Sequence, residues 1–142
     1  MLSAIGAQLL ATRAGEISAA RIWIGWTISG LMAAFMLFDA AAKFAKPAQV
    51  VEAFARTGWP MRLSSTLGAI LLTCTAFYLV PQTSVLGAIL LTAYLGGAVA
   101  TNLRLENPLL THILFPMYFG VLIWIGLWVR DPRLGLVFPL LR

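Results

Sequence analysis

The stretch that decides the fold is residues 63–101, LSSTLGAILLTCTAFYLVPQTSVLGAILLTAYLGGAVAT. It contains no Asp, Glu, Lys or Arg, and only a few residues around Pro81 and Gln82 interrupt its apolar character. Each half has about the length needed to cross roughly 30 Å of hydrocarbon as a helix rising about 1.5 Å per residue. The two halves, residues 63–80 and 85–102, therefore predict an antiparallel pair of membrane-spanning helices.

Two further apolar runs flank this pair, at residues 22–44 and 109–129. The chain has 142 residues, of which 61% are hydrophobic and 11% are charged. Soluble domains have roughly 45–50% apolar and about 25% charged residues. A chain this small cannot bury so much apolar surface in a core of its own. We therefore expect an all-α fold, an integral membrane antiparallel four-helix bundle in contact with the lipid bilayer.

A short amphipathic helix is predicted between the first two spans. There, Val50, Val51 and Phe54 recur at helical spacing with polar residues between them. Pro47 suits a first helical position, and Gly58 suits a C-terminal cap. A helix with one apolar face, placed next to a span, is expected to lie in the membrane interface.

The two ends of the chain are expected to lie outside the spans. Residues 1–20 are weakly hydrophobic and lack the basic start of a secretory signal, so they are interpreted as an N-terminal surface segment. The membrane domain then covers residues 21–136, and residues 137–142 form a C-terminal tail. With four spans both ends share one side. Discounting Lys43 as neutralised within its helix leaves slightly more basic residues there, which predicts cytoplasmic termini in the plasma (inner) membrane.

The composition excludes several classes of function. The net charge of +5 does not indicate nucleic acid, because Lys and Arg stand singly or in pairs between apolar runs. The chain has one cysteine, Cys74, and one histidine, His112. These counts exclude an internal disulfide, a Cys-x-x-Cys pair, the usual zinc sites and a bis-histidine haem within one chain. We expect no metal site and no covalently bound cofactor.

Small residues line one face of two spans. On the first span they are Gly25, Ser29, Gly30 and Ala34, and on the third they are Ala93, Gly96, Gly97, Ala100 and Thr101. Such faces let another helix approach closely. The contact is expected either inside the bundle or between protomers of a homo-oligomer.

Polar residues gather at one predicted membrane face. Antiparallel threading brings together the end of the first span, the end of the third and the start of the fourth. The residues found there are Asp39, Lys43, Asn102, Arg104, Glu106 and His112, with Tyr94 and Tyr118 as further hydroxyl groups. At the opposite face the arginines are expected to lie outside the spans, with nothing comparable inside them.

Asp39 and Lys43 are four residues apart with the acid nearer the N-terminus, so they should stack and pair on one helical face. A charged residue inside a span costs about 2.5–3.5 kcal/mol on insertion scales, which makes the pair a functional candidate. The alternative interpretation is a structural lock at the end of the helix, with Lys43 reaching to the headgroups.

His112 lies four residues before Pro116. Proline has no N–H to donate to the His112 carbonyl, so the helix should bend there and leave an acceptor exposed beside the imidazole. This arrangement suits a quinone or another small polar headgroup. The alternative is that His112 bonds across helices or to interfacial water.

Four separated motifs carry a resemblance to a known family. They are FDAAAK at residues 38–43, GWP at 58–60, GAILLTAYLGGAVAT at 87–101 and WIGLWVRD at 124–131. Together they resemble the DoxX-like family of small four-helix membrane proteins. The resemblance implies that Asp39 and Lys43 correspond to an acid and a lysine at the end of the family's first helix. Similar members often have histidine where Asn102 stands, so a scheme with two histidines is not expected here.

The resemblance implies a subunit of a quinone-linked oxidoreductase of the thiosulfate:quinone type. Asp39, Lys43 and His112 would then handle protons as catalytic groups. The residues expected to bind substrate or quinone are Asn102, Arg104, Glu106, Tyr94 and Tyr118. Because the chain shows no flavin motif, haem-ligand pair or cysteine pair, a partner subunit must supply the electron carrier. The alternative is a noncatalytic scaffold or assembly subunit of a larger complex; the apolar centres of the spans disfavour a transporter.

Overall fold

The computed structural model describes residues 2–131 and residue 134, with side chains from residue 19 onward. The predicted tail, residues 137–142, lies outside the described residues. The elements in chain order are α1 (Leu2–Ala45), α2 (Ala48–Thr57), η1 (Met61–Leu63), α3 (Ser64–Leu79), α4 (Ser84–Arg104), η2 (Leu109–Ile113) and α5 (Leu114–Arg130). The first short element, η1, is a 3-10 turn, and η2 is a π-helical turn.

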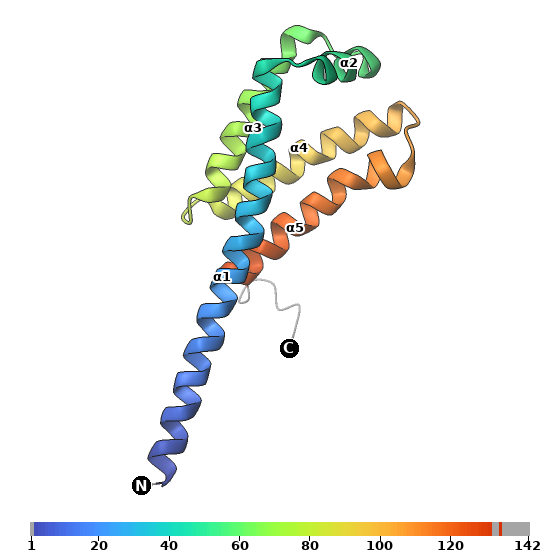
Figure 1. Cartoon of the computed structure of the whole chain (residues 1–142). Coiled ribbons are helices and arrows are strands. Elements are labelled where there is room, and N and C mark those ends of the chain that lie inside the picture. Colours follow the sequence, from blue (N-terminus) through green and yellow to red (C-terminus); the bar gives the residue numbers. More distant parts are fainter. Residues whose placement is uncertain (1, 132–133, 135–142) are drawn as a thin grey trace.

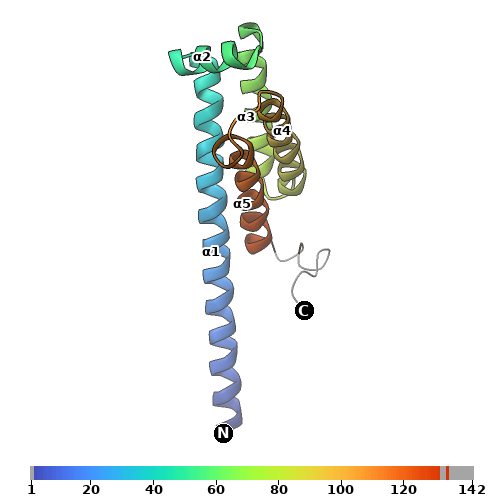
Figure 2. The same cartoon turned by 90° about the vertical axis from the view of Figure 1, so that its right-hand side faces the viewer.

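Among the residues that the structure describes, four helical stretches are long and apolar enough to cross a membrane, as predicted. They are Ala19–Ala45, Met61–Leu79, Ser84–Arg104 and Leu109–Arg130. Helix α1 packs against α3 and α5, and α4 packs against the same two helices. Figures 1 and 2 show that consecutive spans run in opposite directions. The all-α antiparallel bundle is therefore confirmed, and so is the short helix α2 between the first two spans.

The residues of the predicted N-terminal surface segment are helical from Leu2 onward. They continue the first span, so that α1 has 44 residues and a length of about 66 Å at about 1.5 Å per residue. Figure 1 shows the N-terminal part of α1 extending alone beyond the other helices. The helix therefore does not end at the boundary that the weak hydrophobicity of residues 1–20 indicated.

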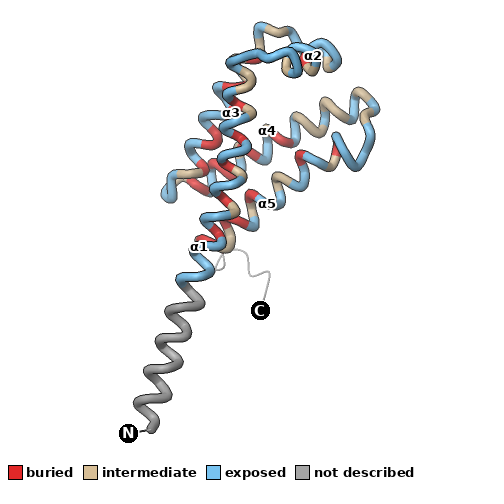
Figure 3. Tube along the Cα trace, viewed as in Figure 1, coloured by how far each residue is buried: buried red, intermediate tan, exposed pale blue. Residues whose placement is uncertain are grey.

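The core of the bundle lies where the four spans cross, and Figure 3 shows the buried residues concentrated there. Tyr78 of α3 is completely buried. Its hydroxyl lies 2.9 Å from the Ile123 carbonyl oxygen, to which it donates, and 2.9 Å from the Ser29 hydroxyl. This hydroxyl therefore joins α3 to both α1 and α5 inside the core.

Three glycines make the crossing possible. A Cβ on Gly25 would lie 2.6 Å from the Arg130 backbone nitrogen, one on Gly87 would lie 2.1 Å from that of Tyr78, and one on Gly126 would lie 2.8 Å from Ser29 Oγ. The small-residue face of the first span is thus used inside the bundle at Gly25 and Ser29. In contrast, a Cβ at Gly30, Gly96 or Gly97 would meet no described atom within 4 Å.

Arg130 corrects the expectation that no charged group lies inside the bundle at this end. It is 8% exposed, and its Nη2 donates to the Tyr78 carbonyl oxygen at 2.6 Å. Its guanidinium lies 4.3 Å from the Trp26 ring centroid and 4.7 Å from that of Tyr78. A planar guanidinium can stack on aromatic faces while it donates in its own plane, which makes the buried position tolerable.

The burial of Arg130 also changes the charge count that predicted the orientation. Arg130 drops out of the count because it is buried inside the bundle and does not lie in a loop. The remaining basic residues are Arg13, Arg21, Arg133 and Arg142 on the terminal side in sequence, and Lys46, Arg56, Arg62 and Arg104 on the other side. The two sides are equal, so the count no longer favours cytoplasmic termini.

The Arg130→Lys variant is expected to fold but to be less stable by about 1–2 kcal/mol, because lysine keeps the charge and loses the stacking on two rings. Thermal unfolding in detergent, followed by circular dichroism, measures the difference. An unchanged melting temperature would show that the stacked geometry contributes nothing to stability.

Candidate functional site

A cavity of about 480 Å³ lies between α1, α2, α4 and α5. Figure 1 shows α4 and α5 leaning away from α1 toward the end where α2 lies. The cavity is lined by Phe35, Met36, Asp39, Lys43, Ala53, Phe54, Thr57, Trp59, Leu67, Ala93, Tyr94, Leu95, Gly97, Ala98, Thr101, Asn102, Phe115, Pro116 and Phe119. It therefore combines an apolar wall with a few polar groups, which is the usual character of a small-molecule site.

Helix α2 covers one end of the cavity with its apolar face. Phe54 is buried and, like Ala53 and Thr57, lines the cavity. Both ends of α2 are set by left-handed residues, Lys46 with φ 51° and Gly58 with φ 71°. Gly58 adopts this conformation without strain and ends the helix, as predicted, with its N–H bonded to the carbonyl of the third residue before it.

Arg104 holds α2 in place from the end of α4. Its Nη2 donates to the Thr57 carbonyl oxygen at 2.5 Å. A cation at the C-terminus of a helix also offsets the partial negative charge of the helix dipole. Arg104 lies outside the cavity, in a small depression with Gly58 and Trp59, so it positions the cover over the cavity.

The Arg104→Ala variant is expected to loosen α2 without unfolding the spans, because the lost hydrogen bond is charge-assisted but exposed and contributes about 1–2 kcal/mol. Amide hydrogen exchange of residues 48–57 should become about tenfold faster, while exchange in α3 stays unchanged. Equal exchange of α2 in both proteins would show that Arg104 does not hold it.

Asp39 and Lys43 form the predicted ion pair, with 2.5 Å between Lys43 Nζ and Asp39 Oδ2. The Lys43 side chain is 14% exposed and the Asp39 side chain 38%, and both line the cavity. Ser64 at the start of α3 donates its hydroxyl to the Lys43 carbonyl oxygen at 2.7 Å. The backbone under the pair is thus fixed, and the Asp39 carboxylate is the more exposed of the two charged groups.

Tyr94 and Asn102 line the same cavity from α4, but they differ in what their polar groups do. Asn102 donates to the Ala98 carbonyl oxygen and accepts from the Asn107 side chain. Both polar atoms of its side chain are therefore already hydrogen-bonded within and just after the end of α4. The Tyr94 hydroxyl has no hydrogen bond within the part of the chain that the structure describes, so it is available to a bound molecule.

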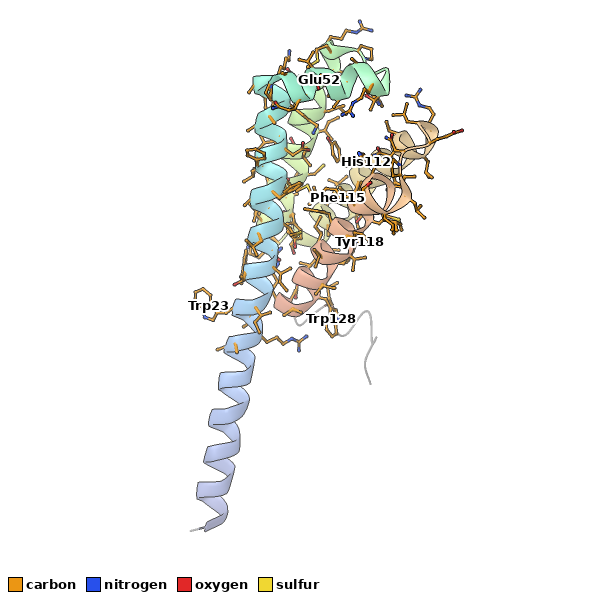
Figure 4. All side chains as sticks on the ribbon, turned by 45° about the vertical axis from the view of Figure 1, so that its right-hand side comes forward. Trp23, Glu52, His112, Phe115, Tyr118 and Trp128 are labelled. Carbon is orange, nitrogen blue, oxygen red and sulfur yellow. The ribbon has the colours of Figure 1, made fainter. Side chains whose placement is uncertain are left out.

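Three phenylalanine rings form a wall that was not predicted as part of the site. The Phe35 and Phe119 ring centroids are 4.4 Å apart, and those of Phe115 and Phe119 are 4.8 Å apart. All three residues line the cavity, and Figure 4 shows Phe115 pointing from the α5 side toward α1. The sequence feature that could have predicted this wall is the four-residue spacing of Phe115 and Phe119, which places both rings on one helical face.

The structure does not bring His112, Glu106 or Tyr118 into the cavity. His112 is exposed, with its Nδ1 2.8 Å from the Thr111 hydroxyl. Figure 4 shows it at the same end of the molecule as Glu52 of α2. Glu106 lies in the exposed turn after α4, and Tyr118 is 51% exposed. Of the eight predicted site residues, Asp39, Lys43, Tyr94 and Asn102 share the cavity and Arg104 adjoins it.

The helical irregularity expected near His112 is present in a different form. The π-helical turn η2 covers Leu109–Ile113, and regular helix resumes at Leu114. In a regular helix, His112 would share a face with Phe115 and Phe119, which do line the cavity. A π-helical turn changes the register of the residues before it. His112 is therefore directed elsewhere, although it is close in sequence.

The fold and the cavity define a class: a multi-pass membrane protein of four apolar helices with an ion pair and an aromatic wall beneath a short amphipathic helix. The sequence model of the DoxX-like family matches residues 27–126. The chain therefore belongs to the DoxX-like family. No curated protein matches the chain, and no solved structure matches it.

Proposed function

We propose that this protein is the membrane subunit of a quinone-linked oxidoreductase and that its cavity binds the quinone head. One observation supports the proposal. The Asp39–Lys43 ion pair, the unbonded Tyr94 hydroxyl and the phenylalanine wall all line the same cavity. Ionisable residues inside spans are retained at a cost in membrane insertion, which favours a functional role for the pair.

A quinone head is a flat ring with two carbonyl oxygens, and each part has a matching group in the cavity. The rings of Phe35, Phe115 and Phe119 suit the flat face of the head. The Lys43 ammonium and the Tyr94 hydroxyl are donors for the carbonyl oxygens. The Asp39 carboxylate can accept a hydrogen bond from the hydroxyl of the reduced form, the quinol.

Reduction of the quinone to the quinol takes up two electrons and two protons, one proton on each oxygen. The electrons must come from a partner subunit with a redox centre, since this chain has a single cysteine and a single histidine. Asp39 and Lys43 both line the cavity, and in this proposal they pass protons to or from the head. We place the complex in the plasma membrane, where quinones are mobile carriers.

Titration of the purified protein with a short-chain quinone tests the proposal. Trp59 lines the cavity, so quinone binding should quench tryptophan fluorescence in a saturable way, and Trp59→Phe should remove most of the saturable signal. Quenching that rises linearly with quinone in both proteins would contradict the proposal. The scaffold function would then be favoured, above all if the protein copurifies with a partner that has no redox centre.

His112→Gln is the control variant for this titration. Because His112 lies outside the cavity, its replacement is expected to leave the quinone dissociation constant unchanged. A clear loss of affinity in this variant would show that His112 takes part in quinone binding.

A further inference from the structure

A second concave region, an apolar groove of about 840 Å³, runs along α4 and α5. Its lining comes from α4 between Thr92 and Val99, from α5 between Pro116 and Trp128, and from Leu134. The only side-chain hydrogen bond across it joins the Trp124 indole N–H to the Thr92 hydroxyl, among the residues that the structure describes. The groove offers almost nothing to a polar ligand.

The groove and the cavity lie on two sides of the same pair of helices. Leu95 and Pro116 line both of them. Gly120 of α5 faces Leu95 across the α4–α5 contact, which we call the α4–α5 seam. A Cβ added to Gly120 would lie 3.9 Å from Leu95 Cδ1. Leu95 and Pro116 therefore form part of the partition between the two spaces.

The two spaces differ in chemistry in the way that the two parts of an amphiphile differ. The cavity holds the ion pair and the Tyr94 hydroxyl near one end of the spans. The groove continues from Val99 and Pro116 along α5 to Trp128, near the opposite end of that span. A molecule with its head in the cavity would thus have its tail directed along the hydrocarbon part of the bilayer.

We infer that the ligand is a quinone with a long prenyl tail, whose tail crosses the α4–α5 seam at Leu95 and Pro116 and lies in the groove. This inference rests on the proposed function and adds a second subsite to it. Phospholipid acyl chains and a second copy of the protein are the competing occupants of the groove, and the test separates them from the tail.

The matched variants are Gly96→Leu and Gly30→Leu. Both positions have open space around the missing Cβ, so both variants are expected to fold. Gly96 lines the groove, whereas Gly30 is exposed on α1. Leucine at position 96 should fill the groove without touching the cavity. Thermal unfolding verifies that both variants are folded before binding is measured.

The experiment compares a head-only quinone, a long-tailed quinone and a long-tailed quinone with a photoreactive tail in detergent micelles. We expect the photoreactive tail to label Val99, Met117 or Val121. Gly96→Leu should weaken binding of the long-tailed quinone about tenfold, which corresponds to about 1.4 kcal/mol. The same variant should leave head-only binding unchanged, and Gly30→Leu should change neither.

Several results would overturn the inference. If Gly96→Leu binds both quinones as the wild type does, or if the label is spread over exposed α1 and α3 residues such as Leu31 and Leu72, the tail does not occupy the groove. Equal labelling of the groove by a photoreactive phospholipid that quinone does not displace would assign the groove to lipid. Crosslinking to a second copy would assign it to a dimer. If the head-only quinone also fails to bind the wild type, the proposed function itself fails.

Discussion

Lys43→Met is expected to weaken binding of a short-chain quinone by about tenfold to a hundredfold. The Lys43 ammonium has three N–H groups, and in the described part of the chain its one hydrogen bond is to Asp39. Hydrogen bonds from charged donors contribute about 1.5–3 kcal/mol, and every 1.4 kcal/mol corresponds to about tenfold in affinity. The dissociation constant from fluorescence titration is the measurement.

The double variant Asp39→Asn/Lys43→Met separates a ligand site from a structural lock. Removing both charges leaves no unpaired ion behind, so much of any stability lost in Lys43→Met should return in the double variant. Quinone affinity should not return with it. If the double variant recovers both stability and affinity, the pair only fixes the end of α1.

Gly87→Ala is expected to destabilise the bundle by about 3 kcal/mol or more, at the upper end of the effects of overpacking. The added Cβ would lie 2.1 Å from the backbone nitrogen of Tyr78 and 2.4 Å from its Cα. No side-chain rotation relieves a clash with backbone, so α3 and α4 must separate. Thermal unfolding in detergent should show a large decrease in melting temperature, or no folded protein at all.

Gly96→Ala is the matched control on the same helix. The added Cβ would have no described neighbour within 4 Å, and alanine is favoured over glycine inside a helix by about 1 kcal/mol. Its melting temperature should be equal to or higher than that of the wild type. If the two variants lose equal stability, the close approach at Gly87 is not what holds α3 against α4.

The helical framework was predictable because apolar run length is a local property of the chain. Residues 63–101 are free of charge and form two spans with a short turn. Helix α2 was likewise predictable from Val50, Val51 and Phe54 and from its cap at Gly58. The burial of Arg130 was not predictable in this way. It depends on how closely Gly25 lets α1 approach α5, which only the packed bundle determines.

The candidate site was predictable where one regular helix carries the residues. Asp39 and Lys43 pair because four residues make about one helical turn. His112 lies at the same end of the molecule as α2 but outside the cavity, because the π-helical turn Leu109–Ile113 changes the helical register before Leu114. The covering role of Arg104 also escaped prediction. It depends on the contact of α4 with the end of α2, far away in sequence.

An experimental structure of the protein with a bound short-chain quinone tests the central claim most directly. We predict density for the head in the cavity against Phe35 and Phe119, with one carbonyl oxygen within hydrogen-bond distance of Lys43 Nζ and the other near the Tyr94 hydroxyl. Density for the quinone only outside the cavity, with the Asp39–Lys43 pair untouched, would contradict it.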